Sequence, residues 1–390
     1  MTTTHPAPAP VGTVPAAPRW TSEIRRDDQA LTELAAEWDA LAARCRTATP
    51  FQAAAWQRSW WRHYGRPGTL RLVLVRRDGR LVGGLALRRG RLGGLTALGG
   101  ELADFTEALV DDSCAAEAAA RLAEALPLRR PWHALDLREV RPGSGAHLVY
   151  AHWRGRRHQL LDSLCQHLPA VSMEELLDRL PGRTAQRSRA KQRKLAQLGV
   201  VARRATLEEV PAAVADLLRL HARQWESRRV TPEHVSARFA AHLTESTAGL
   251  AEHGDAVLYR YHLDGELVAV NLLLRCPSFA GLYLYGTDPE LRGRLDIAGL
   301  LFGTSLADTV RAGIPEISLL RGEEPYKERW RPLREHNHRL LLGPRRFAPA
   351  LTLRLTLARL RAAAAPRLRG PVRRVRGLLD GRRWFSGRRA

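Results

Sequence analysis

Lysine is nearly absent from this chain of 390 residues. Only Lys191, Lys194 and Lys327 occur, so 62 basic residues less three lysines leave 59 arginines. Because arginine fills nearly every basic role, a lysine in a crowded polar loop calls for a chemical explanation. A compact ammonium group donates well to a developing oxyanion and changes its pKa when buried, and arginine does neither so well. Lys327 stands in such a loop, residues 321–330, and is the first candidate for a functional residue.

Cysteine and long apolar runs are also scarce. The four cysteines, Cys45, Cys114, Cys165 and Cys276, show neither CxxC spacing nor a disulfide pattern. This argues against a structural zinc site and favours a reducing compartment. No run approaches the roughly 20 apolar residues that span a bilayer, and the N-terminus lacks the apolar core of a signal peptide. We therefore expect a cytoplasmic protein without a metal.

Acidic residues are missing from the C-terminal end. Residues 341–390 contain 14 arginines and one acid, Asp380, for a net charge of 14 − 1 = +13, and the other 340 residues carry 22 − 13 = +9. Residues 372–379 interleave valine and leucine with arginine at helical spacing. Such a segment fits an anionic membrane surface, a disordered charged tail or a non-specific nucleic-acid binder, and these alternatives stay open.

Two stretches of the chain share one construction. Residues 70–87 and 257–274 each hold two apolar runs around Asp-Gly, a strong hairpin signal, and Asp-Gly-x-Leu-Val occurs at 78–82 and again at 264–268. Each hairpin follows a helical region and leads to a further helix and strand. We predict two similar α/β halves. The expected divisions are a disordered segment 1–19, a first domain 20–182, a second domain 183–345 and a basic tail 346–390.

The second half contains two candidate anion sites. A basic helical stretch, 183–195, is either a solvated helix face or a phosphate-binding face, with even weight on each. Further on, a strand ends near Gly286, a loop holds Arg292-Gly293-Arg294, and a helix follows. Free backbone N–H groups and the helix dipole make such a loop a ready anion site.

This order resembles a known family. A strand, Asp-Pro-Glu-x-Arg-Gly, a long helix and a Gly-Ile-Pro turn into a strand look like the acyl-CoA-binding core of the GNAT acyltransferases. In that family the coenzyme A pyrophosphate lies on backbone amides of a glycine-rich loop. The resemblance places this loop from Arg294 to Gly299, with Arg292 and Gly293 beside it. Ile297 stands where the family has its middle glycine, which hinders close backbone approach.

The doubled layout resembles the CelD/BcsL-type and FemAB-like transferases over roughly residues 22–345. The segment Arg321-Gly322-Glu323, with Tyr326-Lys327 and Trp330, carries most of this resemblance. It implies tandem GNAT-like domains, each a mixed twisted sheet flanked by helices. It also implies N- or O-acyl transfer from acyl-CoA to an amine or hydroxyl of a polysaccharide or cell-envelope precursor. Such a substrate favours the membrane-surface alternative for the basic tail. Two alternatives stay open, namely an aminoacyl-tRNA-dependent transferase and a non-catalytic basic binding protein.

Three residues of the 321–330 loop have two interpretations each. Lys327 is either a donor to the oxyanion or a surface lysine that pairs with Glu323. Tyr326 is either a catalytic hydroxyl or a packing aromatic. Arg321 either orients a substrate carboxylate or phosphate, or pairs with Glu324 or Glu328. The resemblance adds Gly322 and Trp330 as substrate-binding residues.

Outside this loop, four residues are candidates for the site. Asp104 lies among apolar residues and is either an acceptor ligand or base, or a turn-forming aspartate. Trp60 is more naturally core than ligand platform. Asn271 interrupts an apolar strand and either lines a cleft between the halves or pairs with backbone, and Tyr285 is a further substrate contact. Because the first half lacks an Arg-Gly loop before a helix, we expect it to shape the acceptor site.

Overall fold

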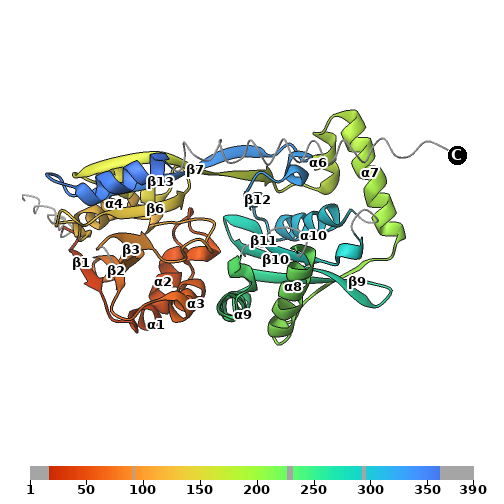
Figure 1. The fold of residues 1–390 in the computed structure, drawn as a ribbon, viewed down its shortest axis with the longest axis horizontal. Helices are drawn as coiled ribbons and strands as arrows, with labels where there is room; N and C mark the ends of the chain where they lie inside the picture. Colours follow the sequence, from red (N-terminus) through yellow and green to blue (C-terminus); the bar gives the residue numbers. More distant parts are fainter. Residues whose placement is uncertain (1–16, 91–92, 226–231, 292–295, 361–390) are drawn as a thin grey trace, which may run out of the picture.

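The computed structural model describes residues 17–90, 93–225, 232–291 and 296–360. In these residues, 13 strands form one mixed sheet with helices against it, and two similar halves lie side by side along its length (Figure 1). This confirms the predicted α/β class and the mixed sheet flanked by helices.

The first half runs from Trp20 to Pro169. In chain order its elements are β1 (Trp20–Arg25), α1 (Ala30–Glu33), α2 (Ala35–Ala42), η1 (Pro50–Gln52), α3 (Ala54–Tyr64), β2 (Leu70–Arg77), β3 (Arg80–Arg89), β4 (Leu95–Ala97), β5 (Leu109–Val110), η2 (Asp112–Cys114), α4 (Ala115–Ala125), β6 (Leu135–Val140), α5 (Gly145–His152) and β7 (Arg156–Pro169).

The second half repeats much of this order. Its elements are α6 (Met173–Asp178), α7 (Gly182–Gln197), β8 (Val201–Arg204), α8 (Val210–Trp225), η3 (Pro232–Val235), α9 (Ala237–Glu252), β9 (Ala256–Leu263), β10 (Glu266–Cys276), β11 (Phe279–Thr287), η4 (Pro289–Leu291), α10 (Ile297–Arg311), β12 (Glu316–Arg321), α11 (Pro325–Glu328) and β13 (Leu333–Gly343).

Both predicted hairpins form, with the same turn. Asp78 and Gly79 have φ values of 52° and 82°, and Asp264 and Gly265 have 52° and 84°. Two successive residues with positive φ match the twist of the flanking strands, and Asp-Gly is a preferred pair for such a turn. The repeated sequence therefore encodes a repeated hairpin, β2–β3 in one half and β9–β10 in the other.

Each half ends its sheet with a strand from the other half. The sheet order reads β6-β13-β7-β12 at its centre, so β13 of the second half pairs with β6, and β7 of the first half pairs with β12. The two exchanged strands pair with each other from Leu333↔His167 to Gly343↔Arg156. One continuous ladder of backbone hydrogen bonds therefore runs through both halves.

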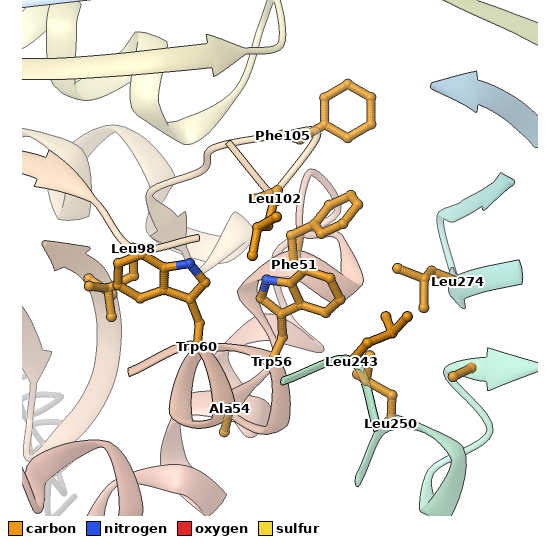
Figure 2. Packing of buried hydrophobic residues seen from close by; sticks show 14 of the residues in the cluster. Phe51, Ala54, Trp56, Trp60, Leu98, Leu102, Phe105, Leu243, Leu250 and Leu274 are labelled. Carbon is orange, nitrogen blue, oxygen red and sulfur yellow. The ribbon is translucent and has the colours of Figure 1, made fainter. Parts of the chain in front are cut away.

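Side chains also join the halves. One apolar cluster includes Phe51 and Trp56 of the first half and Leu243 and Leu274 of the second (Figure 2). Tyr283 of β11 donates its hydroxyl to the Leu102 carbonyl at 2.9 Å. Burial of large apolar side chains across this contact makes the two halves one packed body.

The predicted tail begins as a folded helix. Residues 349–360 are helical, and Leu351 and Leu355 are buried against Ala134 and Leu341 of the first half's sheet. Arg354 pairs with Asp136 at 3.0 Å. The described part of the 346–390 segment is therefore packed structure, and the predicted amphipathic stretch 372–379 lies outside the described residues.

The contact between α3 and α9 predicts a pH dependence of stability. His242 is fully buried there, 3.0 Å from the Ser59 hydroxyl through Nδ1, and no hydrogen-bond partner from the described residues reaches its Nε2. Burial lowers the His242 pKa from 6.5 to about 3. Below pH 6.5 His242 binds a proton in the unfolded chain but stays neutral in the folded chain. The contribution of neutral His242 to stability is therefore fully present above pH 6.5 and is lost as the pH falls towards 3.

We expect His242→Leu to flatten the decrease in unfolding free energy between pH 6.5 and pH 4, by up to about 1.4 kcal/mol per pH unit. Denaturant unfolding at several pH values measures this slope, with His262→Leu in β9 as the control. Equal slopes in wild type and His242→Leu would contradict the assignment.

Candidate functional site

A wedge opens between the parallel strands β11 and β12. The two strands share only the pairs Ala280↔Ile317 and Gly281↔Ser318. Pairing of β10 with β11 shifts between Leu272↔Leu284 and Leu273↔Leu282, so Tyr283 is an extra residue, a β-bulge. A bulge changes which face each later side chain occupies. Tyr285 therefore packs with the apolar cluster that includes α10.

The wedge contains a small pocket of about 410 Å³, counting the space open to solvent. We call it the wedge pocket. It is lined by Asn271, Leu282, Leu284, Tyr285, Ala298, Leu301, Phe302, Leu319, Tyr326 and Trp330. Four of the lining residues were site candidates from the sequence, although they come from four different elements or loops. They are Asn271, Tyr285, Tyr326 and Trp330.

The wedge pocket has few polar lining residues, and their protonation and hydrogen bonding can be described. Burial raises the Tyr326 pKa, so its hydroxyl stays protonated near neutral pH. The Trp330 indole N–H is buried and meets no hydrogen-bond acceptor within the described ranges, and its ring packs 4.6 Å from that of Phe302. Asn271 donates to the Ser305 hydroxyl at 2.8 Å and accepts from Tyr261 at 3.3 Å. The pocket thus offers two donors, Tyr326 and Trp330, in apolar surroundings.

Side chains of α8 bind the backbone of β11 at the wedge. The Thr287 N–H donates to Gln224 at 3.2 Å, and the Tyr285 carbonyl lies 2.8 Å from His221 Nδ1. Because a carbonyl only accepts, His221 carries its proton on Nδ1, and its Nε2 accepts from His234 Nδ1 at 3.4 Å. This chain of bonds leaves a lone pair on His234 Nε2.

Both histidines are neutral near neutral pH. Burial lowers the His221 pKa, and burial together with His221 lowers the His234 pKa to about 4. No role could be predicted for this pair from the sequence, because His221 in α8 and His234 in η3 lie 13 residues apart. Their meeting depends on how α8 and η3 fold back together.

A buried ion-pair cluster joins the halves beside the wedge. Arg321, at the end of β12, contacts Asp104 through Nε, Glu139 through Nη1 at 3.3 Å and the Glu101 carbonyl through Nη2 at 2.8 Å. Burial alone lowers the Arg321 pKa, but Asp104 and Glu139 outweigh it and raise the pKa above its ordinary value. The predicted pairing of Arg321 with Glu324 or Glu328 is wrong, because Glu328 pairs with Arg334 at 2.6 Å and Glu324 with Lys327.

The exchanged strands hold this cluster in place. Glu139 has a φ of 56° and accepts from Ser163 of β7 and, at 3.0 Å, from Asn337 of β13. The cluster of Asp104, Glu139, Arg321 and Asn337, here named the seam cluster, therefore exists only because β7 and β13 cross between the halves.

Lys327 follows Tyr326 of the wedge pocket in sequence and bonds to Arg321 of the seam cluster. Its side chain is buried, with the residue 2% exposed, and Nζ donates to the Arg321 carbonyl at 2.8 Å and to Glu324 at 2.7 Å. The interpretation as a surface lysine paired with Glu323 is thus wrong. Gly322 has a φ of 117°, and a Cβ there would overlap the Glu324 carboxylate, so glycine permits the Lys327–Glu324 pair.

The start of α10 is closed by a carboxylate. Asp296 caps the helix, accepting from the Gly299 N–H at 3.4 Å, and Arg329 binds it at 2.7 Å. A Cβ on Gly299 would lie 2.8 Å from Arg329 Nη2, so glycine lets this pair approach. Arg329 Nε and Nη2 are buried and have no hydrogen-bond partner in the described part of the chain, and the guanidinium lies 4.4 Å from the Trp330 ring. Of the predicted phosphate loop, Arg292, Gly293 and Arg294 lie outside the described residues.

Two of the predicted site residues, Trp60 and Asp104, contact other parts of the protein and do not line the wedge pocket. Trp60 stacks on Tyr64 at 5.7 Å in the core between the halves and does not line the wedge pocket. Asp104 is buried and pairs with Arg321. In the described ranges, no group of three or more histidine, cysteine, aspartate or glutamate side chains could hold a metal ion, and no helix could cross a bilayer.

Comparison with known proteins agrees with this geometry. Residues 182–328 match the family model of the acetyltransferase (GNAT) domain. The chain carries a GNAT domain and is an acyltransferase. That domain contains the β11–β12 wedge, α10 and Lys327. No curated protein matches the chain.

Several solved structures share the fold over most of the chain. FemX is 13% identical, with a TM-score of 0.54 over 78% of this chain and 95% of that one. The C-terminal domain of a protein assigned as a lysylphosphatidylglycerol synthetase from Agrobacterium fabrum is 13% identical, with a TM-score of 0.51 over 86% and 96%. A protein of unknown function from Bacteroides thetaiotaomicron is 11% identical, with a TM-score of 0.53 over 79% and 97%. At these identities the likeness concerns the fold alone.

The seam cluster predicts a large effect of Arg321 on stability. Arg321→Gln leaves Asp104 and Glu139 as buried carboxylates without their cation, which typically costs about 3–5 kcal/mol. Denaturant unfolding measures this loss, and adding Glu139→Gln should recover part of it. As a control, Arg334→Gln removes an exposed ion pair and should cost less than about 1 kcal/mol. An Arg321→Gln variant as stable as the control would refute the role of the cluster.

Proposed function

We propose that this protein transfers an acyl group from acyl-CoA to an amine or hydroxyl of a polysaccharide or cell-envelope precursor, as the CelD/BcsL-type resemblance suggests. The observation that supports this most is the wedge pocket beside the buried Lys327 within a GNAT domain. The pocket is narrow and largely apolar, and its two donors, Tyr326 and Trp330, suit an acyl thioester rather than a charged group.

Arg329 is the residue best suited to hold the donor's phosphates. Two of its buried nitrogens have no hydrogen-bond partner among the described residues, and Asp296 uses only its Nη1. Arginine binds phosphate through paired N–H groups, so Arg329 offsets the loss of backbone approach at Ile297. The Asp296 carboxylate opposes this, because an anion at the start of α10 occupies the place that the helix dipole offers to phosphate. Donor binding would therefore require the Asp296 carboxylate to move away from the start of α10.

Acyl-CoA would supply an acyl group activated as a thioester. In the proposed reaction, the nitrogen or oxygen of the acceptor bonds to the acyl carbon while the carbon–sulfur bond breaks. His234 Nε2 accepts the proton that the acceptor loses, and the Tyr326 hydroxyl donates a proton to the departing sulfur. Although a histidine with a pKa of about 4 is a weak base, the acceptor becomes more acidic as its lone pair bonds to carbon.

Lys327 would stabilise the charge on the carbonyl oxygen. Its ammonium has three N–H groups, of which one binds the Arg321 carbonyl and one binds Glu324. Glu324 is half-exposed, so solvent can replace this bond at small cost when the ammonium turns to the oxyanion. The seam cluster, with Asp104 of the first half, lies on the acceptor side and fixes the Arg321 carbonyl that orients Lys327.

A second candidate, transfer from aminoacyl-tRNA, is favoured by one surface. On α7, Arg189 faces α6 and pairs with Glu174 and Asp178, but Arg183, Arg187, Lys191 and Lys194 are exposed without an ion pair to any described residue. Steps of three and four residues place these four cations on one side of the helix. Such a row fits a nucleic-acid backbone, and the Asp296 carboxylate fits a donor other than coenzyme A.

Transfer assays with both donors separate these functions. We expect purified protein to move radiolabelled acyl groups from a panel of acyl-CoAs, and not from a panel of aminoacyl-tRNAs, to a panel of amino sugars and hydroxylamine. Lys327→Met should lower kcat by about 10²–10³ with little change in KM, because oxyanion donors act in the transition state. Arg334→Gln, which removes an exposed ion pair, is the control. Transfer from aminoacyl-tRNA alone, or full activity of Lys327→Met, would overturn the proposal.

The proton-acceptor role of His234 predicts an unusual pH profile. Activity requires neutral His234, so kcat/KM should stay level on acidification through pH 6.5 and fall only near pH 4. His234→Gln keeps a polar side chain but cannot take a proton, and should lose about 10²-fold in kcat together with this acid limb. A wild-type limb near pH 6.5, or an unchanged profile in His234→Gln, would exclude the role.

A further inference from the structure

The last described helix, residues 349–360, is apolar on two sides. Its inner side packs on the sheet through Leu351 and Leu355. On its outer side, Leu353, Leu357 and Leu360 are 54%, 45% and 61% exposed. Steps of four and three residues bring these three leucines onto one stripe. Figure 1 shows this helix, in blue, against the first half.

Basic and aromatic residues surround the stripe. Phe347, just before the helix, is 66% exposed. Arg345, Arg346 and Arg359 are exposed and form no ion pair or hydrogen bond with the described residues, whereas the inward Arg354 pairs with Asp136. The stripe therefore combines apolar side chains with unneutralised cations, in a segment, 341–390, whose net charge is 14 − 1 = +13.

The combination selects among possible partners. A second copy of the chain would cover the leucines but would bring like charges together, which is unfavourable. A nucleic acid would neutralise the arginines but would leave three leucines and a phenylalanine in water. An anionic bilayer satisfies both groups, since the acyl region takes up the apolar side chains and the lipid phosphates attract the arginines.

We propose that Phe347, Leu353, Leu357 and Leu360, with Arg345, Arg346 and Arg359, form a lipid face that binds the surface of an anionic membrane. The helix lies in the interface plane and does not cross the bilayer. This inference rests on the exposed stripe and its charge, and not on the proposed donor or acceptor. It also places the wedge pocket on a protein held at a membrane, where an envelope acceptor would be carried.

Vesicle co-sedimentation of the full chain tests the lipid face. We expect binding to vesicles of phosphatidylglycerol with phosphatidylcholine and much weaker binding to phosphatidylcholine alone. The triple change Leu353→Ser, Leu357→Ser, Leu360→Ser should weaken binding by about tenfold or more. The matched control, Leu161→Ser, Leu207→Ser, Leu333→Ser, removes three other exposed leucines and should bind as wild type. Arg345→Gln, Arg346→Gln and Arg359→Gln should each cost about fivefold on anionic vesicles.

Each other outcome overturns the proposal. A triple variant that binds vesicles as tightly as wild type, or as its control, would contradict the lipid face. The comparison requires a folded variant, so its melting temperature is measured and must equal that of wild type. If the triple variant does not fold, Leu357→Ser alone replaces it. Wild-type dimers that the triple change dissociates, seen by sedimentation velocity, would assign the stripe to contact between copies. Acyl transfer to a soluble amine should be unchanged in the triple variant, which separates failure of the lipid face from failure of the proposed function.

Discussion

The exchange of β7 and β13 between the halves is the constraint on which the rest of the structure depends. In sequence β7 belongs to the first half, but it pairs with β12 of the second half. Likewise β13 belongs to the second half but pairs with β6 of the first. Because the two strands also pair with each other, neither half can close its sheet without the other. The end of β12, and with it residues 321–330, therefore takes its position from both halves together.

The seam cluster shows the energetic side of this constraint. Two carboxylates and a guanidinium are buried at the crossing, which is tolerated only because each charge meets its partners. Glu139 is further fixed by Ser163 and Asn337, one from each exchanged strand. The same Arg321 that neutralises the carboxylates presents its carbonyl to Lys327. A change at the junction of the halves therefore alters the position of the carbonyl that binds Lys327.

Local patterns predicted much of the fold and part of the site. Asp-Gly turns and alternating apolar runs are short-range signals, so both hairpins, α7 and the helix after the phosphate-like loop could be predicted. Lys327, Tyr326 and Trp330 were found through one contiguous segment. The alternative partners considered for Arg321, Glu324 and Glu328, are wrong, because its carboxylate partners Asp104 and Glu139 are near only in space. For Lys327 the neighbouring Glu324 takes the place of the suggested Glu323. The His221–His234 pair and the Asp296–Arg329 pair carried no sequence signal, since each joins separate elements.

The sequence by itself determined the elements, the repeated hairpin and the residue types available for acyl transfer, because these depend on periodicity, turn chemistry and composition over a few residues. Only the tertiary structure decided which of these residues meet. A bulge at Tyr283 set the face on which Tyr285 lies, the strand exchange set the partners of Arg321, and packing of residues 349–360 left three leucines exposed. Contacts between residues distant in sequence follow from the whole packed body, which no local pattern specifies.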